Sequence, residues 1–278
     1  MSNKKTVLIT GCSTGIGKLA AKTFQDRGWN VVATMRTPEK ETELTELDDV
    51  LVTRLDVADR ASIQQAVNSA LDRFGALDCV VNNAGVGGHA LLEQSSDEMT
   101  RALYETNVFG PMNVCRAVIP IMRERGEGCI INVTSMAGWV GLPLETTYCG
   151  TKHAMEGMTE SLYFELKPLG IQAKTVAPGA YLQTAFTENA DDGQIAKGDE
   201  LADYAEKLRA HFRQSISSEG ADTADPQEVA DKIFECATTE TPVHNPVGAD
   251  AQLIVAMLAS PPRDEFLAKA EPLLLPSA

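Results

Sequence analysis

The feature that most constrains the fold is an alternation of short apolar runs with longer helical patterns through the first two thirds of the chain. Helical periodicity covers Ile16 to about Arg27, Arg60 to Phe74, Asp97 to about Arg123 and Thr147 to about Leu169. Between these segments the runs KTVLIT, NVVATM, VLVTRL, LDCVVNN, GCIINVTS and IQAKTVA are rich in β-branched residues and predict strands. Because these runs are almost continuously apolar, we expect a parallel sheet that is buried on both faces. The pattern therefore predicts an α/β, doubly wound fold with right-handed crossovers and helices on both faces.

After Pro178-Gly179 the pattern changes to a long polar segment. Residues from about Tyr181 to Ala224 are acidic, are interrupted by glycine and have only weak periodicity. A long insertion in a compact domain is more often a binding loop than a linker, so we expect a substrate lid at about 181–224. A helix from Pro226 to about Thr238, a strand around His244 to Ala249 and a terminal helical stretch follow. A single domain over 1–278 fits this pattern better than two domains.

Composition and charge exclude several classes of function. A net charge of -15 argues against a nucleic-acid partner, whose phosphates require a basic face. No apolar stretch is long enough to span a membrane, and the start MSNKKTVLITG lacks the apolar region of a signal peptide. The six cysteines form no C-x-x-C pair and no cluster with the four histidines, so we expect reduced thiols and no metal site. The expected location is cytoplasmic.

The segment TGCSTGIG, Thr10 to Gly17, lies where the first predicted strand meets the first predicted helix. Backbone N–H groups and the positive end of a helix meet a pyrophosphate at such a junction. Gly11 permits a tight turn, Gly15 a close backbone approach, and Gly17 close packing of the helix on the sheet. The spacing is G-x-x-x-G-x-G, whereas the dinucleotide fingerprint is G-x-G-x-x-G. On its own, the same segment also fits a tight connection without a ligand.

Tyr148 and Lys152 are four residues apart in a predicted helix and therefore face the same way. The ordinary pKa of a tyrosine, about 10, is too high for proton exchange near neutral pH. A nearby ammonium group favours the phenolate, and lowering the pKa by about 3 units requires roughly 4 kcal/mol. The pair is thus a candidate for general acid–base catalysis, although a tyrosine and a lysine one turn apart are usually only part of a helix surface.

Ser135 ends a predicted strand ahead of a glycine-containing turn. Its hydroxyl group is therefore expected at the carboxyl edge of the sheet, where ligands bind in such folds. There it can donate a hydrogen bond to a substrate oxygen that gains negative charge. Thr134 is adjacent, and its hydroxyl group competes for the same role.

Several stretches, in chain order, make the sequence resemble the classical short-chain dehydrogenase/reductase family over roughly residues 5 to 250. They are TGCSTGIG, NNAG, ETNVFG, NVTSMAG, YCGTK, and PG followed by Thr184. The resemblance implies a Rossmann fold and an NADP- or NAD-dependent oxidoreductase in which Tyr148 is the general acid or base. It favours Ser135 over Thr134 as the residue that binds the substrate oxygen. It further implies that Lys152 binds the nicotinamide ribose and that Asn107 holds a water linking Lys152 to solvent.

The same resemblance assigns a set of cofactor-binding residues. Asp56 matches an acid that contacts adenine, although a turn-forming role at the end of a strand is the alternative. The expected set is Gly11, Ser13, Thr14, Gly15, Ile16, Gly17, Arg36, Asp56, Val57, Asn83, Ala84, Gly85, Tyr148, Lys152, Pro178, Gly179 and Thr184.

Arg36 indicates which nicotinamide cofactor is bound. The acid that hydrogen-bonds a ribose 2′-OH is absent from the end of the second predicted strand, and Arg36 stands there instead. A guanidinium group binds a 2′-phosphate through a planar, charge-assisted fork, and Ser13 or Thr14 adds a hydroxyl group. We therefore expect NADP (NADPH), with NAD less favoured; an exposed arginine at a strand end is the alternative.

The substrate is constrained only in class. The segments Val86 to Leu92, Gly138 to Leu144 and the region from Tyr181 are expected to line its pocket. Their apolar residues favour a bulky or aromatic alcohol–ketone pair over a sugar. His89 and His211 are either pocket residues or surface histidines. The residues that carry this expectation are Trp139, Val140, Leu142, Leu144, Tyr181 and Leu182.

At the level of branches within the family, the motifs are most similar to the 17β-hydroxysteroid and retinol dehydrogenases. Two other classes of function remain open from the residues: a dinucleotide-binding regulator without turnover, and an epimerase or dehydratase that uses the nicotinamide transiently. The family resemblance also implies a homodimer or homotetramer formed through the helices Asp97–Arg123 and Thr147–Leu169.

Overall fold

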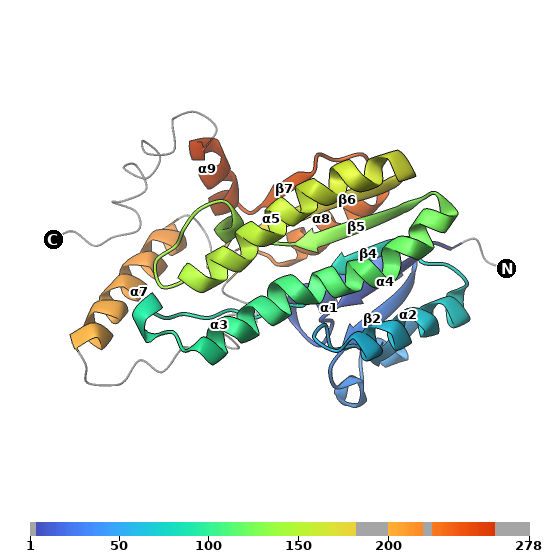
Figure 1. The fold of residues 1–278 in the computed structure, drawn as a ribbon, viewed down its shortest axis with the longest axis horizontal. Helices are drawn as coiled ribbons and strands as arrows, with labels where there is room; N and C mark the ends of the chain where they lie inside the picture. The colour runs from blue at the N-terminus through green and yellow to red at the C-terminus, as the bar shows by residue number, and fades with distance from the viewer. Residues whose placement is uncertain (1–3, 182–199, 219–223, 259–278) are drawn as a thin grey trace.

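A seven-stranded parallel sheet runs through the molecule in the order β3-β2-β1-β4-β5-β6-β7 (Figure 1). The computed structural model describes residues 4–181, 200–218 and 224–258. The strands confirm the predicted sheet and are β1 (Thr6–Thr10), β2 (Asn30–Met35), β3 (Val50–Arg54), β4 (Cys79–Asn82), β5 (Gly128–Val133), β6 (Ile171–Pro178) and β7 (His244–Val247). Because β1 lies between β2 and β4, the direction of winding reverses there, and a ligand crevice is expected at the carboxyl ends of these strands.

Helices cover both faces of the sheet. The helices α1 (Gly15–Asp26) and α8 (Gln227–Thr238) pack on one face, and α2 (Arg60–Phe74), α4 (Gly110–Arg125) and α5 (Thr146–Leu166) pack on the other. In Figure 1, α4 and α5 lie in front of the sheet. The helix α9 (Ala249–Leu258) follows β7. This arrangement confirms the doubly wound α/β fold.

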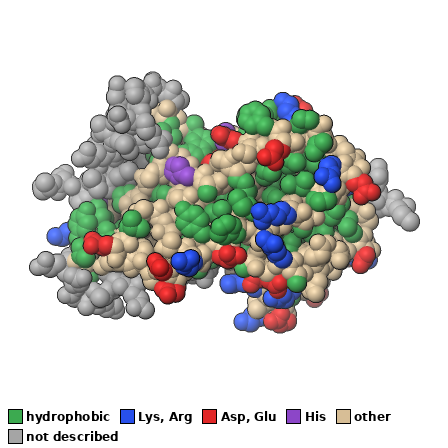
Figure 2. Space-filling view, in the orientation of Figure 1, with side chains coloured by type: hydrophobic (Ala, Val, Ile, Leu, Met, Phe, Trp, Pro, Cys, Tyr) green, Lys and Arg blue, Asp and Glu red, His purple; other side chains and the backbone are tan. Residues whose placement is uncertain are grey.

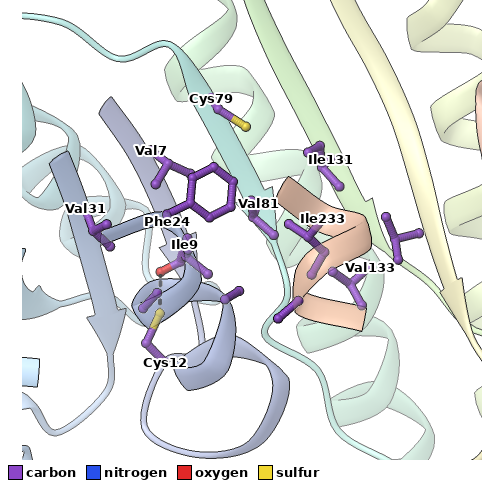
Figure 3. Packing of buried hydrophobic residues seen from close by; sticks show 14 of the residues in the cluster. Val7, Ile9, Cys12, Phe24, Val31, Cys79, Val81, Ile131, Val133 and Ile233 are labelled. Atoms are coloured by element: carbon purple, nitrogen blue, oxygen red, sulfur yellow. Dashed lines mark hydrogen bonds between the residues drawn. The ribbon is translucent and has the colours of Figure 1, made fainter. Parts of the chain in front are cut away.

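Alternate residues of β1 point into two separate cores. Val7 and Ile9 pack against α1 and α8, whereas Leu8 belongs to the cluster on the opposite face. Figure 3 shows the ring of Phe24, from α1, lying among Val7, Ile9 and other aliphatic side chains of the sheet. Phe24 is fully buried, and burial of a side chain of this size contributes roughly 1.5–3 kcal/mol. The two cores hold the central strands rigidly beneath the loops that follow them.

Two helical segments differ from the sequence prediction. The expected helix Asp97–Arg123 consists of α3 (Asp97–Tyr104), a π-helical turn (Glu105–Phe109) and α4. The turn occurs where the side chain of Asn107 bonds the backbone of Val86, an interaction across the fold that periodicity does not reveal. Within the expected lid, the described part forms a helix, α7 (Glu200–Ser218), that the weak periodicity did not predict.

His244 joins β7 to α5. Its Nδ1 lies 2.8 Å from Oε2 of Glu156, and its Nε2 lies 2.9 Å from Oε1 of Glu160. Glu156 is buried, whereas Glu160 is exposed. The hydrogen bond to the Glu156 carboxylate raises the pKa of His244, so the imidazolium form is favoured in the folded protein.

We expect His244→Gln to lower the melting temperature more at pH 6 than at pH 9. A raised pKa in the folded state gives stability that is fully present below the ordinary histidine pKa of about 6.5, and that is lost as the pH rises through the raised value. Thermal unfolding of both proteins at the two pH values tests this. His153→Gln, at an exposed histidine of α5 for which no salt bridge with the described residues is found, is the control for removal of a histidine as such. Equal losses at both pH values for His244→Gln would contradict the assignment.

Candidate active site

The glycine loop between β1 and α1 is shaped by backbone conformations that favour glycine. Gly11 has φ +74° and Gly15 has φ +56°, values that residues with a Cβ rarely adopt. The N–H of Cys12 donates to the carbonyl oxygen of Thr34 at 2.9 Å, which holds the loop against the end of β2. A Cβ on Gly17 would overlap the Gly11 carbonyl oxygen and the Asn83 amide group. The first turn of α1 therefore sits tightly on the loop, as the sequence predicts.

Asn83 fixes this loop to the loop after β4. Its Nδ2 donates to the carbonyl oxygens of Thr10 at 2.9 Å and Gly11 at 3.2 Å. In return, Oγ1 of Thr10 accepts from the backbone N–H groups of Asn83 and Ala84, both at 3.0 Å. These bonds span the point at which the winding of the sheet reverses.

Three residues that follow β2 and β3 border the same space as the glycine loop. Arg36 is exposed directly after β2, and no residue in the described part of the chain forms a salt bridge with it. Asp56 follows β3, and its Oδ1 accepts from the N–H of Ala58 at 3.0 Å, which is the turn-forming role considered above. Asp56 and Val57 also border the cavity, so Asp56 can form the turn and still contact a ligand there.

Ser135, Tyr148 and Lys152 come together beyond the carboxyl end of β5. Ser135 follows β5, and its Oγ accepts from the N–H of Ala137 at 3.1 Å. Tyr148 and Lys152 lie on α5 and are 7% and 6% exposed, which places both within the site and not on an outer helix surface. The Nζ of Lys152 donates to the carbonyl oxygen of Val133 at 3.1 Å and lies 5.6 Å from the centre of the Tyr148 ring.

The expected lowering of the Tyr148 pKa is not found in this structure. Burial raises the pKa of Tyr148, and the nearby carboxylate of Glu145 raises it further, while the hydrogen bond with Ser135 lowers it. Burial also lowers the pKa of Lys152 to about 8. Attraction between the phenolate and the ammonium ion would lower the pKa of Tyr148, whereas removal from water disfavours both charged forms.

The side chains of Asn107 and Thr134 both make hydrogen bonds within the protein. Asn107 is buried behind the cavity wall, where its Oδ1 accepts from the Val86 N–H and its Nδ2 donates to the Val86 carbonyl oxygen, both at 2.9 Å. Thr134 also borders the cavity, but its hydroxyl group donates a hydrogen bond to Glu156. The hydroxyl group of Thr134 is therefore already used, and Ser135 is left as the candidate that can bind a substrate oxygen.

One cavity of about 870 Å³ brings together nearly all of the predicted cofactor and catalytic residues. Asn107 is not among those that line it, and Thr184 lies outside the described residues. The Thr14 side chain makes no capping bond to α1, so the N–H groups of the first turn suit a pyrophosphate. The predicted residues that line the cavity are Gly11, Ser13, Thr14, Gly15, Ile16, Gly17, Arg36, Asp56, Val57, Asn83, Ala84, Gly85, Ser135, Tyr148, Lys152, Pro178 and Gly179. Their chemistry fits a nicotinamide dinucleotide.

The remaining wall of the cavity has both apolar and charged residues, and it includes residues that were not predicted. Of the expected pocket residues, Val86, His89, Leu142, Leu144 and Tyr181 line it. Trp139 packs edge-on against His244 instead, Val140 is buried in the core, and Leu182 lies outside the described residues. Pro143 also lines the cavity and lies within the expected segment Gly138 to Leu144. Additional lining residues include Met136, Glu145, Glu206, Arg209, Phe212 and Arg213.

Only one of these additional residues had a signal in the sequence. Glu145 precedes Tyr148 by one helical turn, so its position near the phenol was within reach of sequence reasoning. The residues of α7 are far from the motifs in sequence, and nothing in their pattern indicates the cavity. His211 is on α7 but does not line the cavity.

Within residues 4–181, 200–218 and 224–258, no helix has the length and hydropathy needed to cross a bilayer. Over the same ranges, no group of three or more His, Cys, Asp or Glu side chains is placed to bind a metal ion. The described cysteines are all free and buried.

Comparison with solved structures shows similar chains that bind either nicotinamide cofactor. A short-chain dehydrogenase from Streptomyces avermitilis superposes with a TM-score of 0.81 at 31% identity, covering 97% of both chains. ElxO with NADP bound has a TM-score of 0.76 at 27% identity, covering 90% of this chain and 99% of ElxO. A 3-ketoacyl-(acyl-carrier-protein) reductase from Brucella melitensis in complex with NADH has a TM-score of 0.76 at 29% identity, with coverage of 90% and 99%.

Sequence comparison identifies the family. An uncharacterized oxidoreductase of Bacillus subtilis is 37% identical over 247 residues, which are 86% of each chain. The model of the short chain dehydrogenase family matches residues 5–195, which include the glycine loop, Ser135, Tyr148 and Lys152. The chain therefore belongs to the short chain dehydrogenase family of NAD(P)-dependent oxidoreductases.

Proposed function

We propose that this protein interconverts a secondary alcohol and a ketone, or an aldehyde, with NADP(H), and that Tyr148 is the general acid and base. The observation that carries the proposal is the single cavity in which Ser135, Tyr148 and Lys152 share a wall with the glycine loop and Arg36. Neither a regulator without turnover nor an epimerase or dehydratase is favoured by any feature of this site.

Each residue of the site has a separate role in the proposed reaction. The bound nicotinamide supplies the carbon that gives or receives the hydride. Ser135 donates a hydrogen bond to the substrate oxygen, and Tyr148 transfers the proton to or from it. Lys152 is held by the Val133 carbonyl oxygen, and its ammonium group would bind the nicotinamide ribose. The Asn107 side chain holds the backbone of Val86 beside the cavity. Asn107 also belongs to the π turn, where it would hold the water that links Lys152 to solvent.

The preference for NADP rests on Arg36. Its position after β2, its exposure and the absence of a described salt-bridge partner all suit a guanidinium group that binds a 2′-phosphate. Similar chains with known structures bind NADP in one case and NADH in another, so the family alone does not decide the cofactor.

The apolar wall favours a bulky apolar substrate, such as a steroid-like or aromatic compound. Val86, Met136, Leu142 and Phe212 provide this surface. Because α7 contributes Phe212 from within the expected lid at about 181–224, we assign a lid function to α7; residues 182–199 and 219–223 of that segment lie outside the described residues.

We also propose a homodimer or homotetramer formed through α4 and α5. Phe109 and Phe164 are 48% and 73% exposed beside or on these helices. Figure 2 shows hydrophobic side chains gathered over the middle of the face where Figure 1 places α4 and α5. An exposed apolar surface of this kind is typical of a subunit interface.

We expect Arg36→Asp to reverse the preference for NADPH over NADH. A hydrogen bond to a charged group contributes about 1.5–3 kcal/mol, so losing the fork should weaken NADPH binding by roughly 10- to 100-fold or more. The measurement is the dissociation constant of each cofactor from fluorescence titration. Arg54→Asp, another exposed arginine at a strand end but outside the cavity, is the control. An unchanged ratio in Arg36→Asp would falsify the assignment of Arg36.

We expect Tyr148→Phe to lower kcat by roughly 10²- to 10⁴-fold while NADPH still binds, because the general acid is lost and the ring is kept. The rate of NADPH consumption with a panel of ketones measures this. The chain contains a matched control: Tyr163 and Lys167 have the same spacing on the outer side of α5, where Lys167 donates to the Tyr163 hydroxyl group at 2.8 Å. Tyr163→Phe should leave kcat unchanged, and full activity in Tyr148→Phe would rule out the proposed role.

A further inference from the structure

A buried carboxyl group faces the apolar part of the cavity next to Tyr148. Glu145 stands at the start of α5, and its side chain is 12% exposed. Its Oε1 lies 3.3 Å from Nδ1 of His89, and both residues line the cavity. The two loops that carry them are joined by a hydrogen bond of 2.8 Å from the Ala90 N–H to the Leu144 carbonyl oxygen.

The described salt-bridge partner of this carboxyl group is His89, which lines the same cavity. Glu145 occupies the N-cap position of α5, yet its side chain makes no capping hydrogen bond. The residue before it, Leu144, has φ +65°, a conformation that is unfavourable for a leucine. An acid buried at a strained turn costs stability, and such features persist where the site uses them.

Near neutral pH the Glu145 side chain can accept a hydrogen bond from a ligand in either of its protonation states. Burial raises the pKa of Glu145 to about 7, so the acid and the carboxylate are both populated there. The ionisable groups around it are Tyr148 and Cys149 on α5, Lys152 one turn further, His89, and Glu206, Arg209 and Arg213 from α7. In both forms Glu145 has an oxygen that accepts a hydrogen bond.

We propose that Glu145 and His89 form a subsite for a hydrogen-bond donor, a hydroxyl or an ammonium group, which the substrate carries close to its reacting carbon. This inference rests on the proposed function, because the position of the reacting carbon is defined by Tyr148 and Ser135. Val86, Met136 and Leu142, which line the same cavity, offer no side-chain acceptor for such a donor group. A substrate that lacks the donor places an apolar group against the Glu145 carboxyl group without adding a hydrogen bond to the contact with His89, and is therefore disfavoured.

The test uses three probes of one chain length with NADP+: 2-octanol, 1,2-octanediol and 1-amino-2-octanol. We expect the wild-type protein to prefer the diol or the amino alcohol over 2-octanol by at least tenfold in kcat/KM. In Glu145→Leu this ratio should fall to within about threefold of unity. Glu145→Gln distinguishes the two donors, because a neutral amide oxygen still accepts from a hydroxyl group but no longer attracts an ammonium ion. Glu165→Gln, an exposed acid of the same helix, is the control.

Calorimetric titration of the same probes in the presence of NADP+ gives a readout that does not depend on turnover. A binding preference for a donor-bearing probe that disappears in Glu145→Leu supports the subsite even if no probe is oxidised, in which case the proposed reaction alone fails. Equal binding of all three probes to the wild-type protein overturns the subsite. Equal losses for all three probes in Glu145→Leu do so as well.

Discussion

The site depends on a series of buried amide hydrogen bonds that begins at Asn83. The Asn83 side chain joins the glycine loop to the loop after β4, and the neighbouring Asn82 donates to Asn132 on β5 at 2.8 Å. Asn132 in turn donates at 2.8 Å to Thr159 on α5, the helix that carries Tyr148 and Lys152. Buried polar groups are costly when they lose a partner, so each bond resists a shift of its neighbours. The cofactor loop and the catalytic helix are therefore held in one frame, although they lie far apart in the sequence.

The sequence was sufficient to predict the parts of this molecule that follow from local pattern. Continuous apolar strands and intervening helices led to the parallel sheet, and the order of the motifs led to the residues that share the cavity. Interactions across the fold were not predictable in the same way. The π turn at Asn107 depends on a bond to Val86, and the position of α7 over the cavity depends on contacts that leave no periodic signal.

Burial explains why the chemistry of the site was harder to predict than its composition. The spacing of Tyr148 and Lys152 is visible in the sequence, but Tyr163 and Lys167 repeat that spacing on the exposed side of the same helix. Only the first pair is removed from water, and this removal raises the pKa of Tyr148 and lowers that of Lys152. A pattern of residue types does not contain the solvent exposure that decides between charge attraction and desolvation.

The π turn between α3 and α4 has a consequence for how this chain tolerates insertions and deletions. A π turn accommodates one residue more than an α-helical turn, and successive helical residues differ in direction by about 100°. Loss of one residue from Glu105–Phe109 would restore regular α-helical winding with little rotation of α3 relative to α4, but the directions of the side chains within the segment would change. Asn107 would then leave Val86, and the backbone of the cavity wall would lose both of its bonds. The length of this short helical segment is thus fixed by an amide group that never enters the cavity.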